Sequence, residues 1–302
     1  MKSPVRIMTV ALAAGGLSAA AALGLRGADT PVRFGTADLA TGIRIHYADA
    51  GDPAAEPIIM LHGYSDSWYS FSPIMPLLES RYRLLAIDQR GHGASDQPAS
   101  GYGLRDMAED VVAFMDELKI ERATIIGHSM GSLVAQQLGV IAPGRVERLV
   151  LIGSGTTLRQ MNDQGAFAEA VNALTDPVSL EFIRGFQEST IHHPVPKAFL
   201  DSVVGESTKL SARVWKALLA GMLGTPPADG LARHGIPTLL VWGNDDSVFS
   251  KEQRDALAAR LPDAERLDYE DTGHATHWER PEQFAEDLDD FIRRTPARDA
   301  AR

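Results

Sequence analysis

The chain has 302 residues, of which 44% are hydrophobic, and this size fits one large α/β domain with an insertion or two small domains. Its formal net charge of −11 and the lack of a basic run longer than Arg293-Arg294 argue against nucleic-acid binding, which needs clustered Lys and Arg. The chain contains no cysteine, which excludes thiolate catalysis, cysteine-ligated zinc and disulfides.

The first residues have the pattern of a secretory signal peptide. Lys2 and Arg6 precede an uncharged stretch of 19 residues, Ile7 to Leu25, with small residues around Ala19–Ala22. We therefore expect residues 1–28 to be a leader that is cleaved, and the protein to be exported to the periplasm or secreted. The alternative is an uncleaved leader that anchors the chain to a membrane, although its glycines and alanines make a weak insertion signal.

Short apolar runs then alternate with helical patterns along most of the chain. The predicted strands are Ile43–Ala48, Ile58–Leu61, Arg83–Ile87, Thr124–Ile126, Arg148–Ile152, Thr238–Trp242 and the weaker Glu265–Tyr269. The predicted helices between them are Ser72–Ser80, Leu104–Leu118, Ser129–Ile141, Lys251–Arg260 and Pro281–Arg293. This alternation predicts an α/β fold with a mostly parallel sheet and helices on both faces. No G-x-G-x-x-G follows any strand, which argues against a dinucleotide-binding fold.

The alternation is interrupted by residues 154–235. About 80 residues separate two predicted strands where one crossover helix needs far fewer. The segment contains four helical patterns, Ala166–Leu174, Ser179–Glu188, Pro196–Val204 and Ser211–Leu223. Because it follows a strand at the carboxyl edge of the sheet, where such folds bind ligands, we expect a helical cap over the site, although a passive decoration is the alternative. Residues 29–153 and 236–294 then form the core, and 295–302 a flexible tail.

The most informative motif is Gly127-His128-Ser129-Met130-Gly131, a G-x-S-x-G pentapeptide between a predicted strand and a predicted helix. A serine at such a sharp turn projects from the sheet beside the N-terminus of the helix. The glycines are expected because side chains there would collide with the neighbouring backbone. Ser129 is thus a candidate nucleophile.

Two later motifs supply the base and the acid that a serine nucleophile needs. Gly243 is followed by Asn244, Asp245 and Asp246 after a strand, and Gly273-His274 follows the last weak strand. The order Ser, Asp, His along the chain is that of one hydrolase fold. Asp245 remains an alternative acid.

With these motifs, the chain resembles the α/β-hydrolase family with a helical cap, over roughly residues 35–294. The matching residues are His62-Gly63, the run Asp88 to Asp96, the serine pentapeptide, Trp242-Gly243-x-x-Asp246, and Gly273-His274 followed by Glu279-x-x-Glu282. The resemblance implies an eight-stranded type of sheet with the cap inserted after strand 6. It also implies a serine hydrolase without a cofactor.

The resemblance assigns roles to single residues. Ser129 is expected to be the nucleophile, Asp246 the acid and His274 the base, with His277 as the rival base. The backbone N–H groups of Tyr64 and Met130 are expected to form the oxyanion hole. Trp68 is a candidate substrate-binding residue. His62, His92 and His128 are expected to be structural. His192 and His193 are adjacent, and we expect their imidazoles to point apart, so no metal is predicted.

Ser129 also limits the reaction, because epoxide hydrolases and haloalkane dehalogenases of this family use an aspartate at that position. The loop after His62 lacks the Gly-Pro-Gly and Gly-Gly-Gly runs of many aminopeptidases and lipases. We therefore expect hydrolysis of a small-molecule carboxylic ester or lactone through an acyl-enzyme. A C–C bond hydrolase or a cofactor-free perhydrolase of the haloperoxidase type is the alternative. A hydrolase fold that has lost catalysis and only binds a ligand is a further alternative.

Overall fold

The computed structural model describes residues 32–161 and 164–296. The predicted leader (1–28) and most of the predicted tail (295–302) lie outside the described residues. Within them, no helix is both long and apolar enough to cross a membrane.

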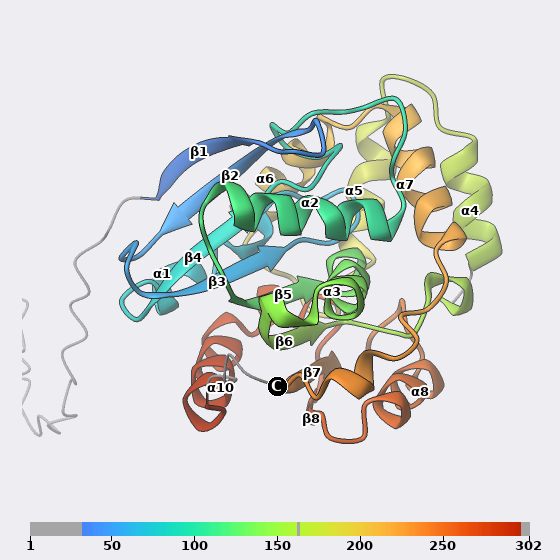
Figure 1. Ribbon diagram of the computed structural model, residues 1–302. Helices are drawn as coiled ribbons and strands as arrows, with labels where there is room; N and C mark the ends of the chain where they lie inside the picture. The colour runs from blue at the N-terminus through green and yellow to red at the C-terminus, as the bar shows by residue number, and fades with distance from the viewer. Residues whose placement is uncertain (1–31, 162–163, 297–302) are drawn as a thin grey trace, which may run out of the picture.

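An eight-stranded sheet forms the centre of the molecule, with strand order β1-β2-β4-β3-β5-β6-β7-β8 (Figure 1). The strands are β1 (Arg33–Asp38), β2 (Arg44–Ala50), β3 (Glu56–Leu61), β4 (Tyr82–Ile87), β5 (Ala123–His128), β6 (Val146–Ile152), β7 (Thr238–Gly243) and β8 (Glu265–Tyr269). β1 and β2 pair antiparallel with each other, and β2 pairs antiparallel with β4, whereas the pairs from β4 to β8 are parallel. The predicted fold class is therefore confirmed.

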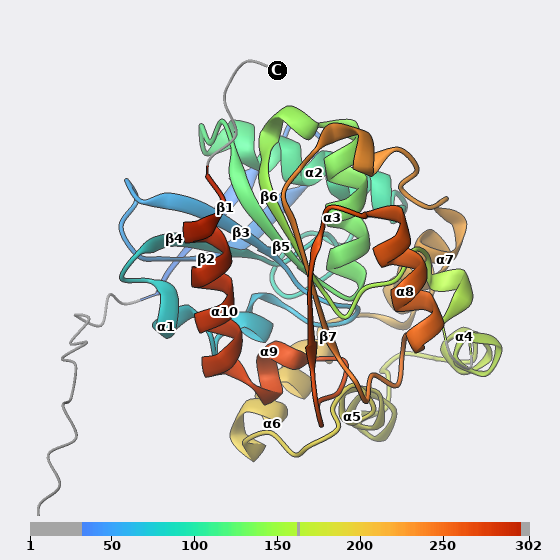
Figure 2. The same ribbon diagram turned by 90° about the horizontal axis from the view of Figure 1, so that it is seen from below.

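Helices cover both faces of this sheet because its inner strands are apolar on both sides. In β5, Ile125 belongs to one buried cluster and Ile126 to the other, as the two-residue period of a strand requires. The helices α2 (Leu104–Glu117), α3 (Met130–Ile141) and α8 (Lys251–Arg260) pack on the Ile125 side. The helices α1 (Met75–Leu78) and α10 (Pro281–Arg294) pack on the Ile126 side, and Figure 2 shows α1 beside α10.

The segment between β6 and β7 is helical in its described part and forms the cap, as predicted. It contains α4 (Gln164–Asn172), α5 (Leu180–Glu188), α6 (Lys197–Ser207) and α7 (Ala212–Gly224), and the 3-10 turns η3 (Leu158–Gln160) and η4 (Leu231–His234). Trp215 of α7 is fully buried against Phe182 and Phe186 of α5, which gives the cap its own aromatic core. Tyr64 of the sheet domain donates from its hydroxyl to the backbone oxygen of Trp215 at 2.6 Å, which attaches this core to the loop after β3.

Among the described strands and α-helices, the sequence patterns missed two elements and misplaced a third. β1 was missed because its residues are mostly exposed and alternate few apolar side chains. The short helix α9 (Thr276–Glu279) follows the predicted base and has no long apolar period. Within the predicted helix over Ser72–Ser80, the structure has only the short α1, and a 3-10 turn, η1 (Trp68–Phe71), precedes it.

Candidate active site

Ser129 lies between β5 and α3 in a strained backbone conformation, with φ 52° and ψ −117°. Such a conformation costs a non-glycine residue about 1–3 kcal/mol, so the surrounding structure must enforce it. A Cβ on Gly131 would lie 2.0 Å from the carbonyl oxygen of Leu61, and one on Gly127 would lie 2.3 Å from that of Gly131. The two glycines therefore let α3 begin directly against the end of β3, and this forces the turn at Ser129.

Asp246 and His274 form a buried pair at the carboxyl ends of β7 and β8. The Nδ1 atom of His274 lies 2.9 Å from Oδ2 of Asp246, and the other carboxylate oxygen accepts from the N–H groups of Val248 and Phe249 at 2.7 and 3.0 Å. Burial by itself would raise the pKa of Asp246. The charge and hydrogen bond of His274 and the two N–H donors outweigh burial, so this pKa lies below its ordinary value. Asp246 is thus held as a carboxylate that orients the imidazole.

The second ring nitrogen of His274, Nε2, is free to act as a base. This atom is buried and makes no hydrogen bond to any residue that the structure describes. Both His274 and Ser129 line one pocket under the cap. A Cβ on Gly153 would meet the His274 ring at 2.8 Å, so the glycine after β6 makes room for this imidazole. The structure therefore brings the three predicted catalytic side chains to one edge of the sheet.

The two alternatives for acid and base have other surroundings. Asp245 is exposed, and its N–H donates to the carbonyl oxygen of Thr272 at 3.0 Å in the turn after β7. His277 is fully buried outside the pocket lining, with Nε2 3.2 Å from the hydroxyl of Ser70. Burial and two neighbouring histidines place the pKa of His277 well below its ordinary value. Asp245 is therefore not placed to orient a buried imidazole, and His277 is not placed to accept a proton from Ser129.

The predicted oxyanion donors belong to the loop after β3 and to the first residue of α3. Met130 is the first residue of α3, so its N–H has no acceptor within the helix. Tyr64 follows β3 in a tight turn, in which the N–H of Asp66 donates to the carbonyl oxygen of Gly63 at 3.3 Å. The N–H of Tyr64 donates to no acceptor in the described part of the chain. Both groups can therefore donate to a bound ligand.

Two buried histidines hold this turn in place. His62 accepts from the N–H of Gln89 at 3.1 Å, and His92 accepts from the N–H of Ser65 at 3.3 Å. Burial lowers the pKa of His92 to about 3 and also lowers that of His62. Both rings are therefore neutral in the folded protein and can accept these bonds, consistent with the structural roles predicted for them.

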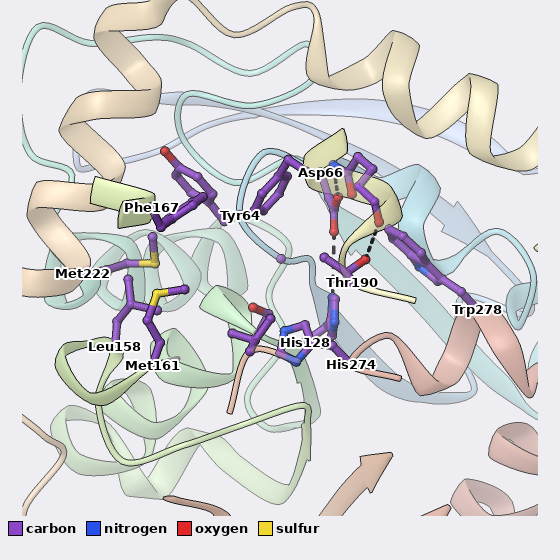
Figure 3. A pocket seen from close by; sticks show the side chains of 15 residues that line it. Tyr64, Asp66, His128, Leu158, Met161, Phe167, Thr190, Met222, His274 and Trp278 are labelled. Atoms are coloured by element: carbon purple, nitrogen blue, oxygen red, sulfur yellow. Dashed lines mark hydrogen bonds and ion pairs between the residues drawn. The ribbon is translucent and has the colours of Figure 1, made fainter. Parts of the chain in front are cut away.

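The pocket has an apolar wall and a polar wall. Figure 3 shows Leu158, Met161, Phe167 and Met222 on one side of the pocket, with His128, His274 and Trp278 on the other. The remaining lining residues are Gly63, Tyr64, Asp66, Ser129, Phe186, Gln187, Thr190 and Val248. None of these fifteen residues is Lys or Arg. The pocket thus suits a neutral, largely apolar ligand with a few polar atoms.

The structure places Trp68, the candidate substrate-binding residue, away from the pocket that Ser129 and His274 line. Trp68 is not among the residues that line the pocket, and its ring packs edge-on against Phe34 of β1 at 5.0 Å between centroids. The chain turns into η1 directly after Ser67, which accepts from the N–H of Tyr69, and this turn carries the indole away from the pocket. The tryptophan that lines the pocket is Trp278, four residues after His274.

Several polar lining residues were not predicted as site residues. Asp66 is buried and accepts from the side-chain amide of Gln187 in α5 at 3.0 Å. His128 was expected to be structural, yet neither of its ring nitrogens has a hydrogen-bond partner among the described residues, and Nδ1 lies 3.8 Å from the Asp66 carboxylate. Asp66 follows the His62-Gly63 motif and His128 lies within the serine pentapeptide, so the sequence could have indicated that both lie near the site. Gln187 and Thr190 lie in the cap, where no motif points to them.

Comparisons with known proteins agree with this geometry. The sequence model of the alpha/beta hydrolase fold matches residues 56–281. A 2-hydroxy-6-oxononadienedioate/2-hydroxy-6-oxononatrienedioate hydrolase of Cupriavidus pinatubonensis is 31% identical over 268 residues, covering 83% of this chain and 91% of the relative. A Synechocystis protein provisionally named a non-heme chloroperoxidase is 31% identical over 272 residues, covering 83% and 95%. A crystal structure of a provisionally named aryl esterase from Burkholderia cenocepacia superimposes with a TM-score of 0.80 at 26% identity, covering 87% of this chain and 99% of the other.

Proposed function

Because the chain belongs to the α/β hydrolase fold family, we propose that it is a serine hydrolase that cleaves a carboxylic ester or a lactone through an acyl-enzyme. The observation that carries this proposal is the buried Asp246–His274 pair, because the second imidazole nitrogen has no partner among the described residues and His274 lines the same pocket as Ser129. A serine hydroxyl reacts only when a base removes its proton, and an acid must hold that base in the right tautomer.

The reaction has two halves. In the first, His274 Nε2 takes the proton of the Ser129 hydroxyl as its oxygen attacks the ester carbonyl, while Asp246 stabilises the imidazolium. The negative oxygen of the tetrahedral intermediate accepts from the N–H groups of Tyr64 and Met130. The C–O bond of the leaving group then breaks, and His274 returns the proton to it. In the second half, His274 activates water, which releases the acid and restores the serine.

The lining of the pocket favours an uncharged substrate over the substrate of the C–C hydrolase relative. The name of that relative describes a dicarboxylate. A dianion would need cationic partners, but the pocket lining has no Lys or Arg and includes the carboxylate of Asp66. Burying a charge without a partner costs several kcal/mol, roughly. Among the candidate substrate classes, we therefore favour a neutral ester or lactone with an apolar acyl group.

A substrate panel with Ser129→Ala as the control tests this proposal. It should contain p-nitrophenyl esters and lactones of graded acyl size, a 2-hydroxy-6-oxo-dienoate for C–C cleavage, and peroxide with acetate for perhydrolysis. We expect the highest kcat/KM on a neutral ester or lactone and no turnover by Ser129→Ala. Preference for the dienoate or for peroxide would favour the two alternatives. No reaction with any substrate would favour a non-catalytic binding protein.

Export of the protein is a separate proposal that rests on the sequence of residues 1–28. Mass spectrometry of the mature protein decides it, because cleavage near Ala22 removes Lys2 and Arg6. An intact Lys2 in the mature chain would instead support a leader that stays attached and tethers the enzyme to the membrane.

A further inference from the structure

A cluster of two histidines and one aspartate joins the cap to the sheet domain on the surface. His192 and His193 lie between α5 and α6 of the cap, and Asp271 lies between β8 and α9. The Nε2 atom of His192 is 3.3 Å from one oxygen of Asp271, and that of His193 is 2.7 Å from the other. One ligand atom from each residue can be chosen so that all three lie within 4.8 Å of one another.

This arrangement corrects the expectation that the adjacent imidazoles point apart. The two ring centroids are only 4.7 Å apart, because the chain bends at these residues and turns both rings toward the same side. The carboxylate comes from a residue far along the sequence, so no spacing within the cap could have indicated it.

The backbone of the cluster is held firmly. The carboxylate of Glu279 accepts from the N–H groups of His192 and His193 at 3.1 and 2.8 Å, and from that of Gly273 at 2.8 Å. A Cβ on Gly273 would lie 2.5 Å from the backbone nitrogen of His192, so the cap segment lies directly on the residue before His274. The cluster therefore needs little reorganisation to bind a ligand, and it adjoins the loop of the candidate base.

The contact between His193 and Asp271 is the shorter of the two imidazole–carboxylate contacts in the cluster. The Nε2 atom of His193 and the carboxylate oxygen of Asp271 are 2.7 Å apart, against 3.3 Å for His192, and the pair is ionic when the imidazole is protonated. A metal ion that binds here displaces the imidazole proton and takes its place as the partner of both atoms.

The charges around the cluster are mixed. Arg280 donates to the backbone oxygen of Asp271 at 3.0 Å and lies 3.8 Å from its carboxylate. The positive charge of this guanidinium disfavours a metal cation on the same carboxylate. The Glu279 carboxylate, which accepts from the backbone of the two histidines, favours a bound cation. The side chains of His192, His193 and Asp271 are 40%, 42% and 64% exposed, although the Nε2 atom of His193 is itself buried. The cluster therefore lies at the surface, where water can occupy the remaining positions around a bound ion.

We propose that His192, His193 and Asp271 bind one Zn²⁺ ion, and that this ion fastens the cap to the loop that carries His274. Imidazole nitrogen and carboxylate oxygen are ordinary zinc ligands, and three protein ligands plus water complete a four-coordinate ion. Because the ligands come from both sides of the interface, binding favours the state in which the cap rests on this loop.

The test is calorimetric titration of the full-length chain, prepared without a histidine tag and treated with EDTA, with ZnCl₂ at pH 7.5. We expect one saturable site in the wild type, weakened at least about tenfold by His193→Ala and by Asp271→Asn. The control His234→Ala removes a histidine outside the cluster and should keep the site. The Asp271→Asn variant keeps the shape of the side chain, so it remains informative if His193→Ala folds poorly.

Hydrogen–deuterium exchange tests the fastening itself. Zn²⁺ should slow exchange in residues 189–196 in the wild type and in His234→Ala, but not in Asp271→Asn. The proposal is overturned if no saturable uptake occurs, which would mean that the cluster holds only a proton. It is equally overturned if the affinity is the same in His193→Ala and Asp271→Asn as in the wild type. These measurements do not use enzyme activity, so their failure is separate from failure of the proposed reaction.

Discussion

The Nδ1 atom of His274 and the Oδ2 atom of Asp246 lie 2.9 Å apart in the buried interior, although 28 positions separate the two residues. β7 and β8 end side by side in parallel, which brings the loops after them together. Asp246→Asn should leave substrate binding nearly unchanged and lower kcat by about 10⁴-fold, because an amide favours the wrong tautomer of the imidazole. Steady-state kinetics measures both effects. Asp245→Asn is the matched control, and an equal loss in both variants would contradict the assignment of the acid.

The turn at Ser129 depends on the close approach of α3 to β3. Gly131→Ala should lower the free energy of unfolding by about 1–3 kcal/mol, because the added Cβ would lie 2.0 Å from the carbonyl oxygen of Leu61. Gly144→Ala is the control, since a Cβ there meets nothing within 4 Å. Urea denaturation compares the two, and equal stabilities would show that the close approach does not matter.

The buried histidines predict that the folded protein loses stability in mild acid. The pKa of His92 is about 3 in the folded protein and 6.5 ordinarily, so between these values the unfolded chain binds a proton that the folded chain does not. The free energy of unfolding therefore falls as the pH drops through this window, by up to about 1.4 kcal/mol per pH unit for each such histidine. His62, His128 and His277 have lowered pKa values and act in the same direction.

Urea denaturation of the wild type and of His92→Gln between pH 7 and 4.5 measures this effect. In the variant, the free energy of unfolding should depend less steeply on pH, by the amount that corresponds to about one proton. This holds even though the variant is less stable at neutral pH. Parallel slopes would mean that His92 is not the neutral buried group described here.

The apolar wall of the pocket predicts how acyl size is selected. Phe167→Ala should raise kcat/KM for a hexanoate ester relative to an acetate ester by about tenfold, which is the scale expected when a hydrophobic pocket gains or loses a few methylenes. Trp68→Ala should not change this ratio, because Trp68 packs on Phe34 and does not line the pocket. A changed preference in Trp68→Ala with none in Phe167→Ala would reverse the assignment of the two aromatic residues.

The fold was largely predictable because the central strands are continuous apolar runs that need burial on both faces. β1 was not predictable in this way, since an edge strand with exposed residues has no such signal. The candidate catalytic side chains could be named because each follows a strand in a recognised motif. Trp68 could not be placed, because the direction of a side chain after a loop depends on the 3-10 turn that follows.

The cap shows the other limit of sequence patterns. Its four helices were predicted, but which of their side chains face the pocket depends on how the helices pack on the sheet domain. Gln187 lines the pocket and donates to Asp66, and His193 contacts Asp271. Both contacts join distant parts of the chain. Such contacts leave no periodic trace in the sequence.

The most direct test of the account is the reaction of the protein with a fluorophosphonate, followed by intact-mass and peptide mass spectrometry. We expect one adduct per chain, located on Ser129 and absent from Ser129→Ala. We also expect that Asp246→Asn, which keeps the serine but weakens the base, reacts far more slowly. No adduct on the folded wild-type protein, or an adduct on another residue that persists in Ser129→Ala, would contradict the account.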